Sequence, residues 1–306
     1  MTTTRRIKCW ALALLMAAPC SGLAQNTVSA PDVPTQIEFA GEKFDLSRAD
    51  FQERLDRELL SMSFGHINTI LTIKRANRYL PVLSTIMQKE GIPADFVYMV
   101  AIESHYDDTA LSPAGAAGMW QMMPATAKEY GLEVTKYVDE RYDAEKAAVA
   151  ACKYLKKAYA KYGNWLAVAA SYNAGMRRIS DALADQKADC VTDLYLNNET
   201  SRYIFRLFAM KTIMENPAKY GFRFKANQLY QPLECRKVTV SEPVESWIDW
   251  ARKHKISYAL LRELNPWIRN DSLPNPQGKT YKVNVPKANG SFTSGQLKTY
   301  NQNWVK

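Results

Sequence analysis

The stretch 92–107 reads IPADFVYMVAIESHYD, and its spacing decides how the surrounding chain is expected to fold. Proline suits the first turn of a helix and Asp95 complements the helix dipole, so a helix is predicted to begin here. Phe96, Val100 and Glu103 then follow at spacings of four and three residues, which place them on one helix face. We therefore expect the Glu103 carboxyl to lie at the edge of a hydrophobic core instead of in open water.

Helical periodicity continues on both sides of this stretch. Upstream, apolar residues repeat at helical spacing from Phe51 to Gly91, and glycine is a good residue to end a helix. Downstream, helices are predicted over 124–130, 144–162, 164–174 and 199–215. The body of the chain, residues 51–222, is therefore predicted to be almost wholly helical, which makes the fold class mainly α.

The sequence pattern changes after Gly221. Residues 223–235 are predicted to be a connector. Alternating apolar residues then predict strands near 238–240 and 281–285, with two short helices between them, over 247–253 and 258–264. The chain is thus expected to form a small β-α-α-β module over 236–287, followed by a polar, loosely held tail over 288–306.

The first 24 residues have the pattern of a signal peptide. Basic residues precede the apolar run Trp10–Ala18, and small residues up to Ala24 match a signal peptidase site. We therefore expect export to the periplasm or cell envelope, with residues 25–50 as a linker. Because Pro19 is a poor residue before a lipid-bearing cysteine, no lipid is expected on Cys20, and membrane contact is expected only if the chain is lipidated.

Composition limits the classes of partner. Residues 1–24 hold three of the 40 basic side chains and none of the 31 acidic ones, so the remainder carries a net charge of +6. This mild excess fits an anionic polymer such as a cell wall, and it also fits an ordinary lysine-rich surface. Export argues against nucleic acid as a partner. The oligomeric state does not follow from the sequence.

Cysteine and histidine usage limits the chemistry. After export, Cys152, Cys190 and Cys235 would stand in an oxidising compartment, which allows one disulfide whose pairing the sequence does not identify. The three histidines are widely spread and there is no CxxC pattern, so no metal site is predicted. No cofactor is expected.

Three further segments hold residue types that no core requires. Glu103 runs into Ser112–Ala127, SPAGAAGMWQMMPATA, and is followed by AASYNAG at 169–175 and ETSRY at 199–203. In this order and spacing they resemble the lytic transglycosylase branch of the lysozyme-like superfamily, and GMWQ at 118–121 and DERYD at 139–143 are closest to its murein transglycosylase D type. The resemblance covers most of residues 60–222 and implies a lysozyme-like helical catalytic domain.

The resemblance also implies the activity. It is cleavage of the MurNAc–GlcNAc β-1,4 bond of peptidoglycan glycan strands without water, which leaves 1,6-anhydroMurNAc ends. Glu103 would be the single catalytic acid and base, and the Tyr203 hydroxyl would approach its carboxylate. Ordinary glycosidases use two carboxylates. Asp107 matches a family position that is read as structural, so the N-acetyl group of the substrate would supply the missing assistance.

Five residues are implied to bind the substrate: Ser112, Gln121, Tyr172, Asn173 and Tyr203. Gly115 and Gly118 would let the backbone pass close to the sugar. Ser171 departs from the family pattern, which usually has alanine there, and this position is not expected to carry chemistry.

Two alternatives remain open for the whole chain. A goose-type lysozyme-like hydrolase on the same fold would use water in place of the C6 hydroxyl of the sugar. The second alternative, which belongs to another class of protein, is a non-catalytic cell-wall binding protein. The sequence does not distinguish cutting inside glycan strands from cutting at their ends.

The C-terminal module resembles a degenerate LysM unit. The resemblance is carried by LRELNP at 261–266 and YKVNVP at 281–286, whereas SEP at 241–243 replaces the usual Gly-Asp-Thr. Binding of N-acetyl sugars and a purely structural role are both compatible with this pattern.

Overall fold

The computed structural model describes residues 29–287 and 296–305. The described residues from Pro31 onward form one compact unit. The predicted signal peptide, with Cys20, and the first part of the predicted tail, 288–295, lie outside the described residues. Within the described part of the chain, no helix combines the length and the apolar character that a membrane span requires.

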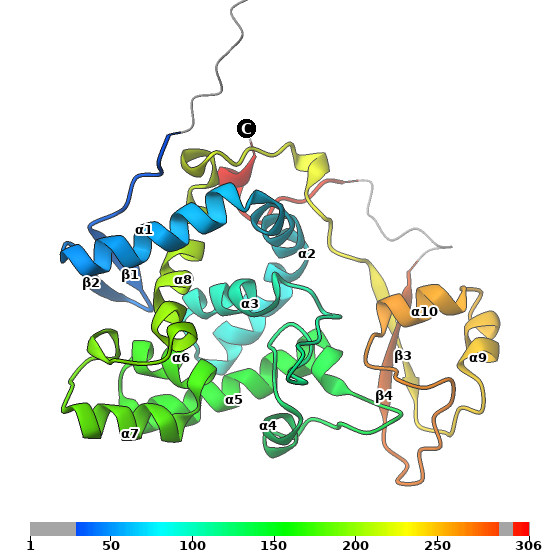
Figure 1. Ribbon diagram of the computed structural model, residues 1–306. Helices are drawn as coiled ribbons and strands as arrows, with labels where there is room; N and C mark the ends of the chain where they lie inside the picture. The colour runs from blue at the N-terminus through cyan, green and yellow to red at the C-terminus, as the bar shows by residue number, and fades with distance from the viewer. Residues whose placement is uncertain (1–28, 288–295, 306) are drawn as a thin grey trace, which may run out of the picture. The chain divides into compact units, whose positions relative to one another are not determined.

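The larger part of the described chain is helical, as the sequence predicts (Figure 1). Its α-helices, in chain order, are α1 (Ala49–Phe64), α2 (His66–Glu90), α3 (Val97–Ser104), α4 (Pro124–Glu129), α5 (Ala144–Tyr162), α6 (Trp165–Ala174), α7 (Met176–Gln186) and α8 (Asn198–Glu215). Helices α1, α3 and α6 all pack against α8. Because α3 carries Glu103 and α8 carries Tyr203, this packing places the two side chains of interest at one helix interface.

Helix ends follow local chemistry. The Asp143 carboxylate accepts hydrogen bonds from the first backbone amides of α5, and the Asn164 side chain does the same for α6. Gly91 ends α2 in the left-handed conformation, with φ of 68°. These ends lie where the sequence predicts them, whereas α7 has no counterpart among the predicted helices.

A β-hairpin precedes α1, so the prediction of a linker over 25–50 is wrong for these residues. Strand β1 (Gln36–Phe39) pairs antiparallel with β2 (Glu42–Asp45). Phe39 is fully buried, and its ring lies 5.4 Å from that of Phe96 and 6.0 Å from that of Phe208. Four-residue strands are too short for the alternation of apolar residues to stand out next to prolines.

The C-terminal module has the predicted β-α-α-β order. Strand β3 (Cys235–Val240) is followed by α9 (Trp247–Lys253), α10 (Tyr258–Leu264) and β4 (Tyr281–Pro286), and β3 pairs antiparallel with β4.

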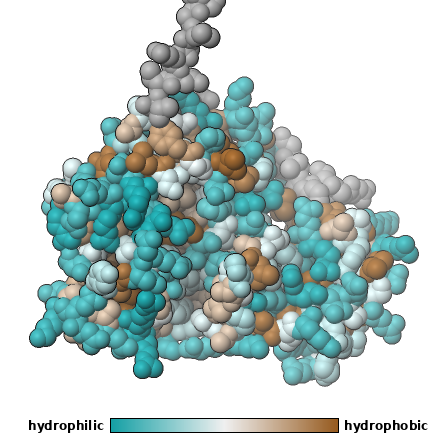
Figure 2. Space-filling view, viewed as in Figure 1, coloured by the Kyte–Doolittle hydropathy of each residue, from teal (hydrophilic) through white to brown (hydrophobic). Residues whose placement is uncertain are grey.

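Viewed as in Figure 1, the surface in Figure 2 is mostly hydrophilic, with hydrophobic residues in small scattered groups.

Part of the predicted loose tail is in fact docked. Trp304 is 2% exposed, and its indole Nε1 donates to the Met214 carbonyl oxygen at 2.6 Å. The Tyr300 amide also donates to the Asn77 side chain. A few scattered apolar residues in a polar stretch give no periodic signal, which is why the sequence pattern did not indicate this contact.

The sequence allows one disulfide, but in the described chain Cys152, Cys190 and Cys235 are all free. Cys152 is buried in α5, whereas the Cys190 sulfur contacts the Thr192 hydroxyl. Cys235 begins β3. The three thiols belong to separate elements.

Replacing the buried tail residue tests the docking. Trp304→Ala is expected to lower the free energy of unfolding by about 3–5 kcal/mol, because a large buried ring and its hydrogen bond are lost. Urea unfolding measures this. Leu297→Ala is the control: Leu297 is 56% exposed, and its loss should cost no more than about 0.5 kcal/mol. Equal, small effects for both variants would mean that the tail is not docked.

Candidate active site

The predicted catalytic carboxyl and the predicted tyrosine meet directly. Glu103 lies in the last turn of α3, and Tyr203 projects from α8. The Tyr203 hydroxyl donates to Glu103 Oε1 at 2.6 Å. Tyr203 is buried and Glu103 is partly buried, so the hydrogen bond lies at the edge of the core, where the spacing of α3 predicts the carboxyl.

Burial dominates the electrostatics of this carboxyl. It raises the pKa of Glu103 from 4.5 to about 7, although the Tyr203 hydrogen bond and the charge of Arg206 both lower it. The negative charge of Glu199 adds to the rise. A carboxyl with a pKa near neutral can donate a proton in one step and accept one in the next.

Tyr172 lies close enough to the Glu103 carboxyl for their charges to interact. Burial, followed by the charge of Glu103, raises the pKa of Tyr172. Its hydroxyl donates to the Trp120 carbonyl oxygen at 2.7 Å, and its ring packs edge-on against that of Tyr154. Asn173 follows on α6 and is partly buried. Tyr172 therefore joins Glu103 and Tyr203 in one cluster.

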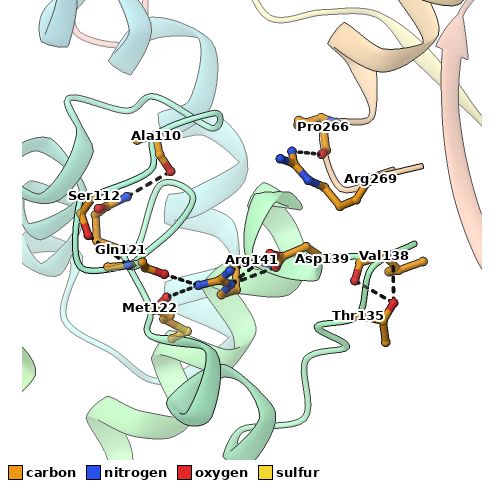
Figure 3. Close-up of polar contacts among 12 residues, drawn as sticks. Ala110, Ser112, Gln121, Met122, Thr135, Val138, Asp139, Arg141, Pro266 and Arg269 are labelled. Atoms are coloured by element: carbon orange, nitrogen blue, oxygen red, sulfur yellow. Dashed lines mark hydrogen bonds and ion pairs between the residues drawn. The ribbon is translucent and has the colours of Figure 1, made fainter. Parts of the chain in front are cut away.

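Ser112 and Gln121 lie on the loop between α3 and α4. The Ser112 hydroxyl accepts a hydrogen bond from the Ala116 amide at 3.0 Å. Gln121 Nε2 donates to the carbonyl oxygens of Gly118, at 2.8 Å, and Ala110, at 3.3 Å (Figure 3). Both side chains hold the loop in shape, and their contact with a saccharide stays a prediction.

Gly118 serves a different contact from the one implied by the resemblance. Its φ is +72°, and a Cβ added there would lie 1.8 Å from the Arg141 carbonyl oxygen. The missing side chain thus admits another part of the protein backbone. Gly115 also has a positive φ, of 89°, with open space around its Cβ position.

Asp107 takes no part in this cluster. Helix α3 ends at Ser104, and His105 adopts a left-handed conformation with φ of 55°. Asp107 then forms an ion pair with Arg75 at 2.9 Å and accepts hydrogen bonds from Thr109. These contacts agree with a structural role for this carboxylate.

Sequence reasoning missed two charged neighbours of Glu103. The Arg206 guanidinium donates to the Ile102 carbonyl oxygen at 3.1 Å, and Glu199 lies in the first turn of α8. Arg206 follows Tyr203 by three residues, so helical spacing was the available signal. A cavity of about 450 Å³ lies beside this corner and is lined in part by Ile102, His105, Glu199 and Arg206.

Two family models match segments of the chain. Residues 81–191 match the transglycosylase SLT domain. The chain carries an SLT domain. Residues 236–289 match the C-terminal LysM-like domain of soluble lytic transglycosylases. The SLT domain contains Glu103, Ser112, Gln121, Tyr172 and Asn173, whereas Tyr203 lies beyond the matched range.

This chain covers only part of the length of each relative that it matches. Membrane-bound lytic murein transglycosylase D of Escherichia coli (strain K12) is 30% identical over 256 residues, which are 80% of this chain and 55% of the relative. A putative tributyltin chloride resistance protein of Alteromonas sp. (strain M-1) is 28% identical over 47% of this chain and 66% of its own length. The chain therefore spans about half the length of the first relative.

Among solved structures, the 70 kDa soluble lytic transglycosylase SLT70 from Escherichia coli matches with a TM-score of 0.39. The two proteins are 22% identical over 45% of this chain and 24% of SLT70.

The raised pKa of Glu103 predicts how stability depends on pH. Since the pKa is about 7 in the folded SLT domain and 4.5 ordinarily, the folded state holds the proton more tightly between these values. The stabilisation that this carboxyl contributes to the folded state is therefore completely present below pH 4.5, and it is lost as pH rises through 7. Glu103→Gln cannot ionise, so its melting temperature relative to wild type should be higher at pH 8 than at pH 4.

The matched control is Glu53→Gln, on the exposed side of α1. Thermal unfolding at both pH values measures the effect for the two variants. A melting-temperature difference between Glu103→Gln and wild type that is the same at pH 4 and pH 8 would contradict the raised pKa.

Proposed function

We propose that the protein is an exported peptidoglycan lytic transglycosylase that cleaves the MurNAc–GlcNAc β-1,4 bond and leaves 1,6-anhydroMurNAc ends. The observation that carries the proposal is the 2.6 Å hydrogen bond from Tyr203 to a carboxyl whose pKa is about 7. The match to the SLT domain and the similarity to murein transglycosylase D support it. Glycan strands of peptidoglycan are the proposed partner, and the periplasm or cell envelope is the proposed location.

In the first step, protonated Glu103 acts as the acid. It donates its proton to the oxygen that links MurNAc C1 to GlcNAc, and the C1–O bond breaks. The N-acetyl oxygen of MurNAc bonds to C1 as the leaving sugar departs with its new hydroxyl. Substrate assistance of this kind replaces the second carboxylate of ordinary glycosidases.

In the second step, the same residue acts as the base. The Glu103 carboxylate takes the proton from the C6 hydroxyl of MurNAc, and O6 attacks C1 while the bond to the N-acetyl oxygen breaks. The product is a 1,6-anhydro ring, and Glu103 is protonated again. The Tyr203 hydroxyl stabilises the carboxylate that exists between the two steps.

We assign substrate binding to Ser112, Gln121, Tyr172 and Asn173, and also to Tyr203. Among these, Tyr172 lies close enough to the catalytic carboxyl that the charge of Glu103, after burial, raises the pKa of Tyr172. The loop that carries Ser112 and Gln121 is tied to α3 by the Ser104 hydroxyl, which donates to the Met119 carbonyl oxygen at 2.8 Å. This bond keeps the loop next to the helix that ends in Glu103.

Removing the acid tests the proposal. Glu103→Gln is expected to lower the rate of muropeptide release from purified peptidoglycan by about 10²–10⁴-fold, because no proton reaches the leaving oxygen. Mass spectrometry of the wild-type digest should show ends lighter by one water than hydrolysed ends. Reducing ends alone would indicate the goose-type hydrolase, and undiminished release by the variant would exclude Glu103 as the catalyst. A wild-type protein that releases nothing yet sediments with peptidoglycan would indicate a non-catalytic binding protein.

The Tyr203 hydrogen bond is expected to lower the upper pH limit of activity. Because this bond lowers the pKa of Glu103, Tyr203→Phe should raise that pKa and shift the alkaline limb of the rate profile to higher pH, with a lower maximal rate. Tyr220→Phe is the control, since its hydroxyl donates to Asp32 outside this cluster. An alkaline limb that stays in place or moves to lower pH in Tyr203→Phe would refute the assigned role.

A further inference from the structure

The C-terminal module shares a hydrophobic core with the helical part of the chain. Val138 and Tyr142, which precede α5, lie in one buried cluster with Trp267 and Ile268 of the module. Ala117, on the loop between α3 and α4, belongs to the same cluster. Val138 and Ile268 are both fully buried and form an isolated antiparallel bridge. A sugar-binding module on a flexible tether would not need such a shared core.

Polar contacts fix the same interface. The Asp139 amide donates to the Trp267 carbonyl oxygen at 2.9 Å, and the Arg269 amide donates to the Tyr137 carbonyl oxygen at 2.8 Å. The Arg269 guanidinium lies 4.3 Å above the Tyr142 ring. The segment 137–142 is therefore held by the module through backbone and side chain together.

Arg141 extends this interface to the loop beyond it. Its side chain is buried, and its Nη2 pairs with the Asp139 carboxylate at 2.7 Å. From the same guanidinium, Nη1 donates to the carbonyl oxygens of Gly115, at 2.7 Å, and Met122, at 3.0 Å. Figure 3 shows Arg141 between Asp139 and Met122. The planar fork of arginine directs separate N–H groups at the three partners, whereas an ammonium group would have to meet all three from a single nitrogen.

The loop in question, residues 112–122, carries Ser112 and Gln121. Arg141 ties together two distant positions of this loop, and the Arg141 carbonyl oxygen lies where a side chain at Gly118 would have to be. Direct contacts thus lead from the module through 137–142 to the loop. The module core, the ion pair and the loop form one continuous buried network.

We infer that Arg141 is a positioning residue and that the C-terminal module holds loop 112–122 in the shape that binds substrate. The module thereby acts as a brace for the active site. The substrate-binding part of this inference rests on the proposed transglycosylase function, whereas the bracing of the loop does not.

Two substitutions break the network from opposite sides. Arg141→Lys retains the positive charge but removes the planar fork that joins Asp139 to both carbonyl oxygens. Ile268→Ala removes packing against Val138. Ile248→Ala is the matched control, because Ile248 lies in α9 of the same module and is 42% exposed. Hydrogen exchange followed by mass spectrometry reports on residues 110–123, and peptidoglycan digestion gives KM and kcat.

Both network variants are expected to exchange faster in 110–123, with α3 and α8 still protected, and to show a KM about tenfold higher with a smaller change in kcat. Ile248→Ala should match wild type in both measurements. General destabilisation would instead raise exchange everywhere and reduce the active fraction without changing KM.

Folded Arg141→Lys and Ile268→Ala proteins with wild-type exchange in 110–123 would overturn the inference. If Ile268→Ala does not fold, Arg269→Ala replaces it, since Arg269 is exposed and its guanidinium contacts Tyr142. If wild type releases no glycan fragments, the proposed function fails, and the exchange data still decide whether the module braces the loop.

Discussion

Burial of the Glu103 carboxyl beside the Tyr203 hydroxyl is the constraint on which the site depends. Desolvation opposes ionisation of this group, and the hydrogen bond and Arg206 only partly offset it, so the pKa settles at about 7. The surrounding helices must therefore be stable enough to keep this carboxyl buried although its ionisation is unfavourable there. The packing of α3 against α8, and the Asn197 side chain that caps α8, provide that support. The result is a group that can exchange its proton near neutral pH.

The sequence could predict the elements that have local signals, and it could not predict those held by contacts between distant residues. Helices with local signals, such as Asp143 before α5 and Asn164 before α6, were predicted with their ends. The hairpin and the docked tail were missed, because Phe39 and Trp304 are held by residues far away along the chain. Single apolar residues in polar surroundings leave no periodic pattern.

The site shows a similar division. Glu103, Tyr172 and Tyr203 were named from motifs, and the structure brings them together. The bracing contacts of Arg141 were not predicted, since they go to backbone carbonyl oxygens, which carry no sequence information. The module is similar in sequence to a LysM-like domain, and it is attached to the helical part through the core that it shares with Val138 and Tyr142. The two are compatible, because a module can be fixed on one side and still present another side to a glycan.

A direct titration of the Glu103 carboxyl tests the central claim. The protein can be labelled with ¹³C at its glutamate carboxyl carbons and followed by NMR across the pH range, with Glu103→Gln used to assign the resonance. The account predicts that the assigned resonance titrates with a pKa near 7. Titration near the ordinary value of 4.5 would contradict it, because Glu103 would then hold too little of the proton that the acid step requires.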